Sequence, residues 1–236
     1  MPQTATPVDD VLVLGNRRPA GSTGAFGGGG SAGNSGGIHE NQITPAEPEP
    51  PYQYDPCDSE EKRQEKAIDA AAAAAAAAIA AAAAAAGEDS LNFRERGCYL
   101  FLQPDGTVIV GEITQGLPFE NGGVGSVKLS LSGRNPGTVI ASVHSHSVGN
   151  VLPSTGRTPI TDDGDRGHLR GMVQMINTGG GNGANARIYI VAPKTTGAGE
   201  PASNVISYYD ESNLESSITD HTAGPEVDPN GQPCPS

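Results

Sequence analysis

Two histidines at the end of an apolar segment are the residues in this sequence best suited to chemistry. His144 and His146 flank Ser145 and complete the segment 138–144, TVIASVH. Residues two apart in an extended strand point to the same side, so both imidazoles can reach one ion. Imidazole suits zinc, and no thiol lies near the pair in the sequence. The pattern favours a zinc site; the alternative is two surface histidines beside a serine.

A catalytic zinc usually has three protein ligands and keeps a fourth position for water. The segment PITDDGDRGHL supplies Asp162, Asp163 and Asp165 directly before a predicted helix. The same aspartates would also suit a helix N-cap and a solvated turn. His168 is a rival ligand, but we expect it on an exposed face of the helix.

Hydrolysis at such a site also needs a general base that takes a proton from water. Glu95 precedes the apolar segment 97–103, and we expect that strand to lie beside the histidine strand. The alternative is a solvated charge between Arg94 and Arg96. Without other information, the solvated charge is the simpler interpretation.

Low-complexity segments surround the part of the chain that can fold. With Gly 33, Pro 19 and no Trp in 236 residues, roughly 150 residues remain for a domain of ordinary size. We expect residues 1–54 to be mostly disordered apart from a short strand at 11–14. We expect one domain over residues 58–210 and a flexible acidic tail over residues 211–236.

An alanine-rich helix opens the predicted domain. It begins at Asp58, which can cap the first turn and form a capping box with Glu61. It ends at Gly87, which adopts the left-handed conformation easily. Alanine contributes little to membrane insertion and the N-terminal half is strongly charged. We therefore expect a smooth helix that a sheet approaches closely, and no membrane span.

The remaining apolar segments have the period of strands, except for residues 165–177, which have the period of a helix. The hairpin turn Pro104-Asp105-Gly106 joins the first two strands. A second helix over 165–177 carries apolar residues at helical spacing. Helices packed against one mixed sheet make an α+β fold. The five predicted strands cover 97–103, 106–115, 138–144, 187–193 and 205–210.

The acidic balance of the chain disfavours several partners. A net charge of −13 and a pI of about 4.6 do not suit nucleic acid, whose phosphates require Lys and Arg, or an anionic membrane surface. No cleavable signal peptide is visible, so we expect a protein that is cytoplasmic or exported by another route. Cys57 and Cys234 could pair in an oxidising compartment, whereas Cys98 is typical of a buried thiol.

Glu95 and the histidine pair together resemble the JAMM (JAB/MPN) family of zinc metallopeptidases. The segment ERGCYL (95–100) is similar to the family segment in which a Glu stands three residues before a small residue that opens an apolar strand. His144-Ser145-His146 matches the family's His-(Ser/Thr)-His. The resemblance covers about residues 65–210. It is closer still to the JAB-like domain of unknown function near the C-termini of RHS-type bacterial proteins, which also has an alanine-rich helix and a strand like YIVAP.

The resemblance implies a zinc-dependent peptidase or isopeptidase that uses a metal-bound water, with a JAB/MPN, cytidine-deaminase-like layering. His144 and His146 would then bind Zn²⁺, and Glu95 would be the acid/base. A peptide or protein would be the substrate.

The loop after the histidines departs from the family pattern. The spacing His-x-His-x7-Ser-x2-Asp fits Ser154 but places Arg157 where the aspartate belongs. A longer loop brings in Asp165, where the helical period begins, with Asp163 as second choice. Ser154 and Thr161 are the candidates for the residue that helps to stabilise the oxyanion.

A second function is compatible with the same resemblance. The altered loop and Cys98 at the usual small position favour a catalytically inactive JAB-like module that binds a partner within a bacterial secreted, toxin or phage-related system. The segment VDDVLVLGNRRP (8–19), followed by a Gly-rich tether, looks like an attachment region for a partner protein. A third possibility is a structural protein with incidental histidines.

Overall fold

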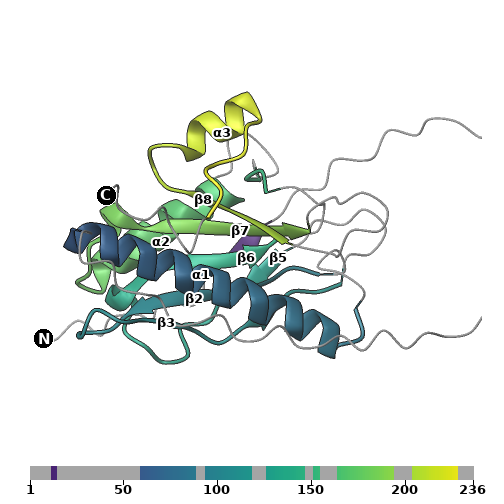
Figure 1. Cartoon of the computed structure of the whole chain (residues 1–236), viewed down its shortest axis with the longest axis horizontal. Coiled ribbons are helices and arrows are strands. Elements are labelled where there is room, and N and C mark those ends of the chain that lie inside the picture. Colours follow the sequence, from purple (N-terminus) through teal and green to yellow (C-terminus); the bar gives the residue numbers. More distant parts are fainter. Residues whose placement is uncertain are drawn as a thin grey trace, which may run out of the picture.

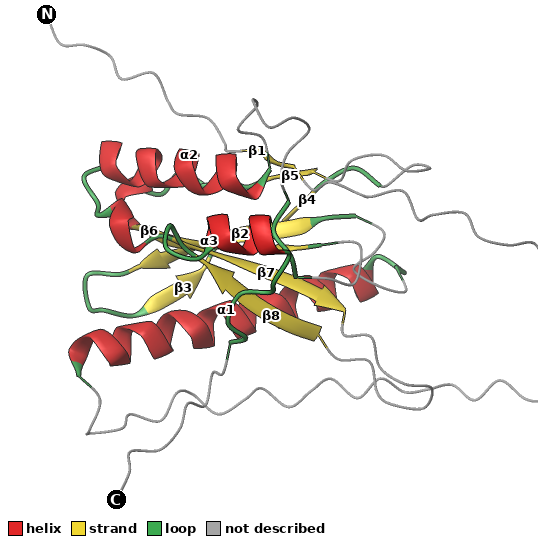
Figure 2. Ribbon diagram, turned by 90° about the horizontal axis from the view of Figure 1, so that it is seen from above, coloured by secondary structure: helices red, strands yellow, loops and turns green. Residues whose placement is uncertain are grey.

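The fold is α+β, as predicted, and the described residues form a mixed sheet and three α-helices (Figure 1). The computed structural model describes residues 59–88, 94–118, 126–146, 151–154, 164–193 and 204–227, and the backbone of the strand Leu12–Leu14. Figure 2 shows the sheet between helix α1 on one side and helix α2 on the other.

Helix α1, Glu60–Ala85, begins one residue later than predicted. Its cap is Ser59, whose side chain accepts a hydrogen bond from the backbone N–H of Lys62 at 3.2 Å. Asp58, the predicted cap, lies outside the described residues. The helix ends at Ala85, two residues before the predicted end, and Gly87 adopts a left-handed φ of +71° just after the cap residue Ala86.

One face of α1 packs on the sheet through small side chains. Ala72, Ala75 and Ile79 are fully buried there. In the described part of the chain, α1 is the one helix long and apolar enough to cross a membrane by length and composition, a property that core helices of soluble proteins share.

The main sheet has the strand order β3-β2-β6-β7-β8, and β4 also pairs with β2. Strands β6 and β7 are parallel, with α2, Asp165–Thr178, between them in the chain, and the other pairs are antiparallel. All five predicted strands are present, the second of them divided into β3 and β4. The strands of the sheet are β2 Arg96–Leu102, β3 Val108–Val110, β4 Thr114–Gln115, β6 Val139–Ser145, β7 Arg187–Pro193 and β8 Asn204–Tyr209.

Alternate side chains of the strands form two separate core layers. Cys98 and Leu100 of β2 pack under α1, whereas Tyr99 and Phe101 pack under α2. Cys98 is a buried free thiol, as predicted, and burial raises its pKa to about 12. Cys57 and Cys234 lie outside the described residues, so their pairing stays a prediction.

Packed structure continues beyond the predicted end of the domain. Helix α3, Leu214–Asp220, contributes Leu214 and Ile218 to the core layer of α2. Glu226 then forms an antiparallel bridge with Ser207 of β8. Residues 211–227 therefore belong to the fold, unlike the flexible tail that the sequence predicts.

A short strand also forms within the N-terminal region, at the predicted place. Strand β1, Leu12–Leu14, pairs antiparallel with β5, Ser126–Lys128. The rest of residues 1–54 lies outside the described residues, so their disorder stays a prediction.

The close approach of α1 to the sheet leads to a stability prediction. Ala75→Leu adds three carbon atoms at a fully buried position, and such overpacking typically costs about 1–3 kcal/mol. Ala77→Leu is the matched control, because Ala77 is exposed on the same helix and leucine is nearly as good a helix former as alanine. Urea unfolding would measure both; equal free energies of unfolding would contradict the packing described.

Candidate metal centre

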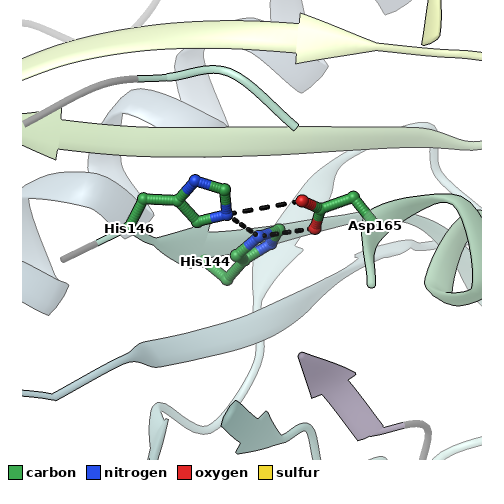
Figure 3. A group of neighbouring side chains, drawn as sticks. All are labelled: His144, His146 and Asp165. Atoms are coloured by element: carbon green, nitrogen blue, oxygen red, sulfur yellow. Dashed lines mark hydrogen bonds and ion pairs between the residues drawn. The ribbon is translucent and has the colours of Figure 1, made fainter. Parts of the chain in front are cut away.

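The end of β6 brings the two predicted histidines together on the α2 side of the sheet. Their Nε2 atoms lie 3.1 Å apart. His144 is fully buried and His146 is 6% exposed. The backbone N–H of His146 still bonds to the carbonyl of Val191 at 2.8 Å, so the strand geometry extends through both histidines. In Figure 3 both rings face the same carboxylate.

That carboxylate belongs to Asp165, the first residue of α2. Its Oδ1 lies 2.9 Å from Nε2 of His144, and its Oδ2 lies 3.4 Å from Nε2 of His146. Gly164 precedes it with a φ of +98°, a conformation that favours glycine. A carboxylate in the first helical turn is stabilised by the helix dipole. Asp165, the first choice from the sequence, therefore joins the histidines.

Ser154 orients this carboxylate. Its Oγ donates to Oδ2 of Asp165 at 2.8 Å and accepts from the backbone N–H of Asp165 at 3.0 Å. A hydroxyl has one proton to donate, so in this arrangement the Ser154 proton serves Asp165 instead of an oxyanion. Thr161, the other candidate for that role, and the rival ligands Asp162 and Asp163 lie outside the described residues.

Glu95 lies on the same side of the sheet as the histidines. In the ladder Gly97 is opposite His144, and extending this antiparallel register by two residues places Glu95 opposite His146. Glu95 is 1% exposed, and its Oε2 has no hydrogen-bond partner among the described residues. Burial raises its pKa to about 8, an effect that His146 opposes and Asp165 reinforces. Glu95 is therefore buried, as the general-base interpretation requires, and is not a solvated charge.

Burial and neighbouring charges shift the pKa values of His144, His146 and Asp165. Burial alone would raise the pKa of Asp165, but the two imidazoles outweigh it and hold that pKa well below its usual range. Burial lowers the pKa of His144 despite Asp165, which favours a neutral ring with a free lone pair. For His146, Asp165 and Glu95 outweigh burial and raise the pKa. A buried anionic carboxylate thus lies between two imidazoles.

The spacing of the three side chains fits one ion. Two ligand atoms bound tetrahedrally to zinc at about 2.0–2.1 Å would lie about 3.3 Å apart. The two Nε2 atoms lie 3.1 Å apart, which is close to that value, and the carboxylate brings a different oxygen to each of them, Oδ1 at 2.9 Å from His144 and Oδ2 at 3.4 Å from His146. One ligand atom from each of His144, His146 and Asp165 lies within 4.8 Å of the others. The group can hold a metal ion, and its two nitrogens and one oxygen are donors that zinc accepts.

Two neighbouring residues that sequence reasoning missed hold the strands in place. The Oγ of Ser145 accepts a hydrogen bond from the backbone N–H of Arg96 at 3.0 Å, which fastens the start of β2 to the histidine strand. A Cβ at Gly97 would lie 2.9 Å from the Cβ of His144, so only glycine fits opposite that histidine. Neither role has a local signal, because each depends on the register between strands far apart in the sequence.

His168 is buried, so its predicted exposed position is wrong. It is 1% exposed, and its Nε2 lies 2.8 Å from the Oγ of Ser142. Burial lowers the pKa of His168 to about 3, which keeps the ring neutral. It lies outside the group of three that could share an ion.

Fold and site together define an α+β protein with a buried His-His-Asp group where a central strand meets the start of a helix. Comparisons of the chain with protein-family models, curated proteins and solved structures found no match. The function must therefore be argued from the site itself.

Proposed function

We propose that the protein is a zinc-dependent hydrolase of peptide or isopeptide bonds, of the JAMM (JAB/MPN) type. The observation that carries the proposal is the convergence of His144, His146 and Asp165, with Glu95 buried on the same side of the sheet. The helix–strand order and the position of the acidic residue one strand from the histidines also agree with that family.

Each residue has a role that follows from its position. When bound, zinc would polarise a scissile carbonyl and lower the pKa of water. His144 and His146 would present nitrogen ligands, for which His146 has to lose the proton that its raised pKa favours. Asp165 would supply the negative charge that offsets the cation. Glu95 takes a proton from the attacking water and passes it to the leaving amine. A nearby cation would also lower the raised pKa of Glu95 and so favour its ionised form.

The second candidate is an inactive metal-binding module of a bacterial secreted or toxin-related system. The nearly complete burial of Glu95 and its pKa of about 8 favour it, because a protonated carboxyl cannot accept a proton. The partner would be a protein bound through the N-terminal segment VDDVLVLGNRRP (8–19).

Hydrolysis of a peptide library and of isopeptide-linked substrates separates these functions. The hydrolase predicts cleavage that a chelator abolishes and added zinc restores. Stoichiometric zinc without cleavage of any member would support the inactive module. Absence of zinc binding would contradict both, and histidine titrations insensitive to zinc would then favour a structural protein.

A further inference from the structure

His168 lies between the sheet and α2, beside the candidate metal centre. Its Nε2 contacts the Oγ of Ser142, a fully buried residue two positions before His144 on β6. Its ring also stacks on Tyr99, with centroids 6.4 Å apart and planes inclined by 22°. The ring is therefore held from two neighbouring strands, by a hydrogen bond from β6 and a ring contact from β2.

The rings of His144 and His168 meet edge to face. Their centroids are 6.1 Å apart and their planes are inclined by 83°. In each ring Nδ1 is buried and has no hydrogen-bond partner among the described residues. A neutral imidazole that gives its Nε2 lone pair to a metal carries its proton on Nδ1. Ligand histidines almost always donate that proton to a partner, which fixes the ring.

We propose that His168, oriented by Ser142, is a positioning residue that fixes the tautomer and orientation of His144 through one water shared by the two Nδ1 atoms. This inference rests on the proposed metal centre. When Nε2–H of His168 donates to Oγ of Ser142, Nδ1 of His168 is an acceptor. A water between the rings then accepts from His144 and donates to His168, so both buried nitrogens are satisfied.

The alternative role, a fourth ligand to the same ion, does not suit the geometry. Nε2 of His168 is directed at Ser142, and the group of ligand atoms within 4.8 Å of one another consists of His144, His146 and Asp165. A neutral, fully buried imidazole can act on the site without binding the metal itself. It then adds a hydrogen bond to a metal ligand and adds no charge.

Zinc affinity of the full chain, measured by competition with a chromophoric chelator, tests this role. His168→Leu is expected to weaken zinc binding by roughly 10–100-fold, the usual effect of removing a residue that orients a ligand. His168→Gln keeps a hydrogen-bonding group and is expected to recover part of the affinity. Ser142→Ala is expected to shift the affinity in the same direction as His168→Leu by a smaller factor. The absorption spectrum of bound Co²⁺ should change in His168→Leu and Ser142→Ala.

Met172→Leu is the matched control, because Met172 is also fully buried and lies one turn further along α2. This variant should bind zinc with unchanged affinity. If circular dichroism shows that His168→Leu does not fold, Ser142→Ala takes its place as the test. The ¹⁵N shifts of the His144 ring are then compared between zinc-loaded Ser142→Ala and wild type. Affinity, Co²⁺ spectrum and ring shifts equal to wild type in the folded variant would overturn the positioning role alone. Failure of the wild type to bind zinc would overturn the proposed function, and this inference with it.

Discussion

Glu95→Gln is expected to keep zinc and to lower the hydrolysis rate by roughly 10²–10⁴-fold, the usual contribution of a general acid or base. The amide has nearly the shape of the carboxyl group but cannot accept the proton of the attacking water. Glu95 is not among the three residues grouped for the metal, so zinc affinity should be largely retained. The loss should appear in kcat rather than in metal content.

Rates of the two proteins at equal zinc occupancy, on a substrate found in the library, measure this effect. Glu112→Gln is the control. Glu112 is exposed, lies two residues after β3, and accepts a hydrogen bond from the Oγ of Ser132. It should hydrolyse the substrate at the wild-type rate. A Glu95→Gln protein that kept wild-type kcat would exclude Glu95 as the acid/base.

Asp165→Asn is expected to lose both zinc and activity. The substitution keeps the size of the side chain but removes the anionic charge that lies between the two imidazoles. We expect zinc affinity to fall by more than about 100-fold, because residues that merely orient a ligand already change it by roughly 10–100-fold. The amide can still bond to Ser154, so much of the local structure should survive.

Zinc titration and circular dichroism of the same samples separate loss of metal from loss of fold. Asp220→Asn, an exposed change at the end of α3, is the matched control and should bind zinc as the wild type does. An Asp165→Asn protein that bound zinc with unchanged affinity would show that Asp165 is not a ligand. The third ligand would then have to come from elsewhere in the chain.

The sequence was sufficient to predict the elements that carry the site. Residues 187–193 form a short, continuous apolar run that predicts a buried strand with the observed bounds, and the helical spacing predicts α2 to within one residue at its end. The pairing of His144 with His146 followed from strand geometry alone. The helical period begins at Asp165, which predicts it as the third ligand and also explains why its carboxylate lies at the end of α2 that faces the histidines.

His168 lies one turn before Met172 and two turns before Ile176, on the apolar face of α2, so the helical spacing itself points to its burial. The rest of the site depends on contacts that no local pattern records. Ser154 bonds to Asp165 across eleven positions of the sequence, a separation that no helical or strand period predicts. Helix α3 was missed because Leu214 and Ile218 are its only large apolar residues.

The central claim is that His144, His146 and Asp165 bind one metal ion. Metal analysis of tag-free protein, purified without chelator, tests it most directly when the wild type and His144→Ala are compared. His39→Ala controls for zinc held by a histidine outside the site. We expect one zinc per chain in the wild type and in His39→Ala, and none in His144→Ala. No zinc in the wild type, or equal zinc in all three proteins, would contradict it.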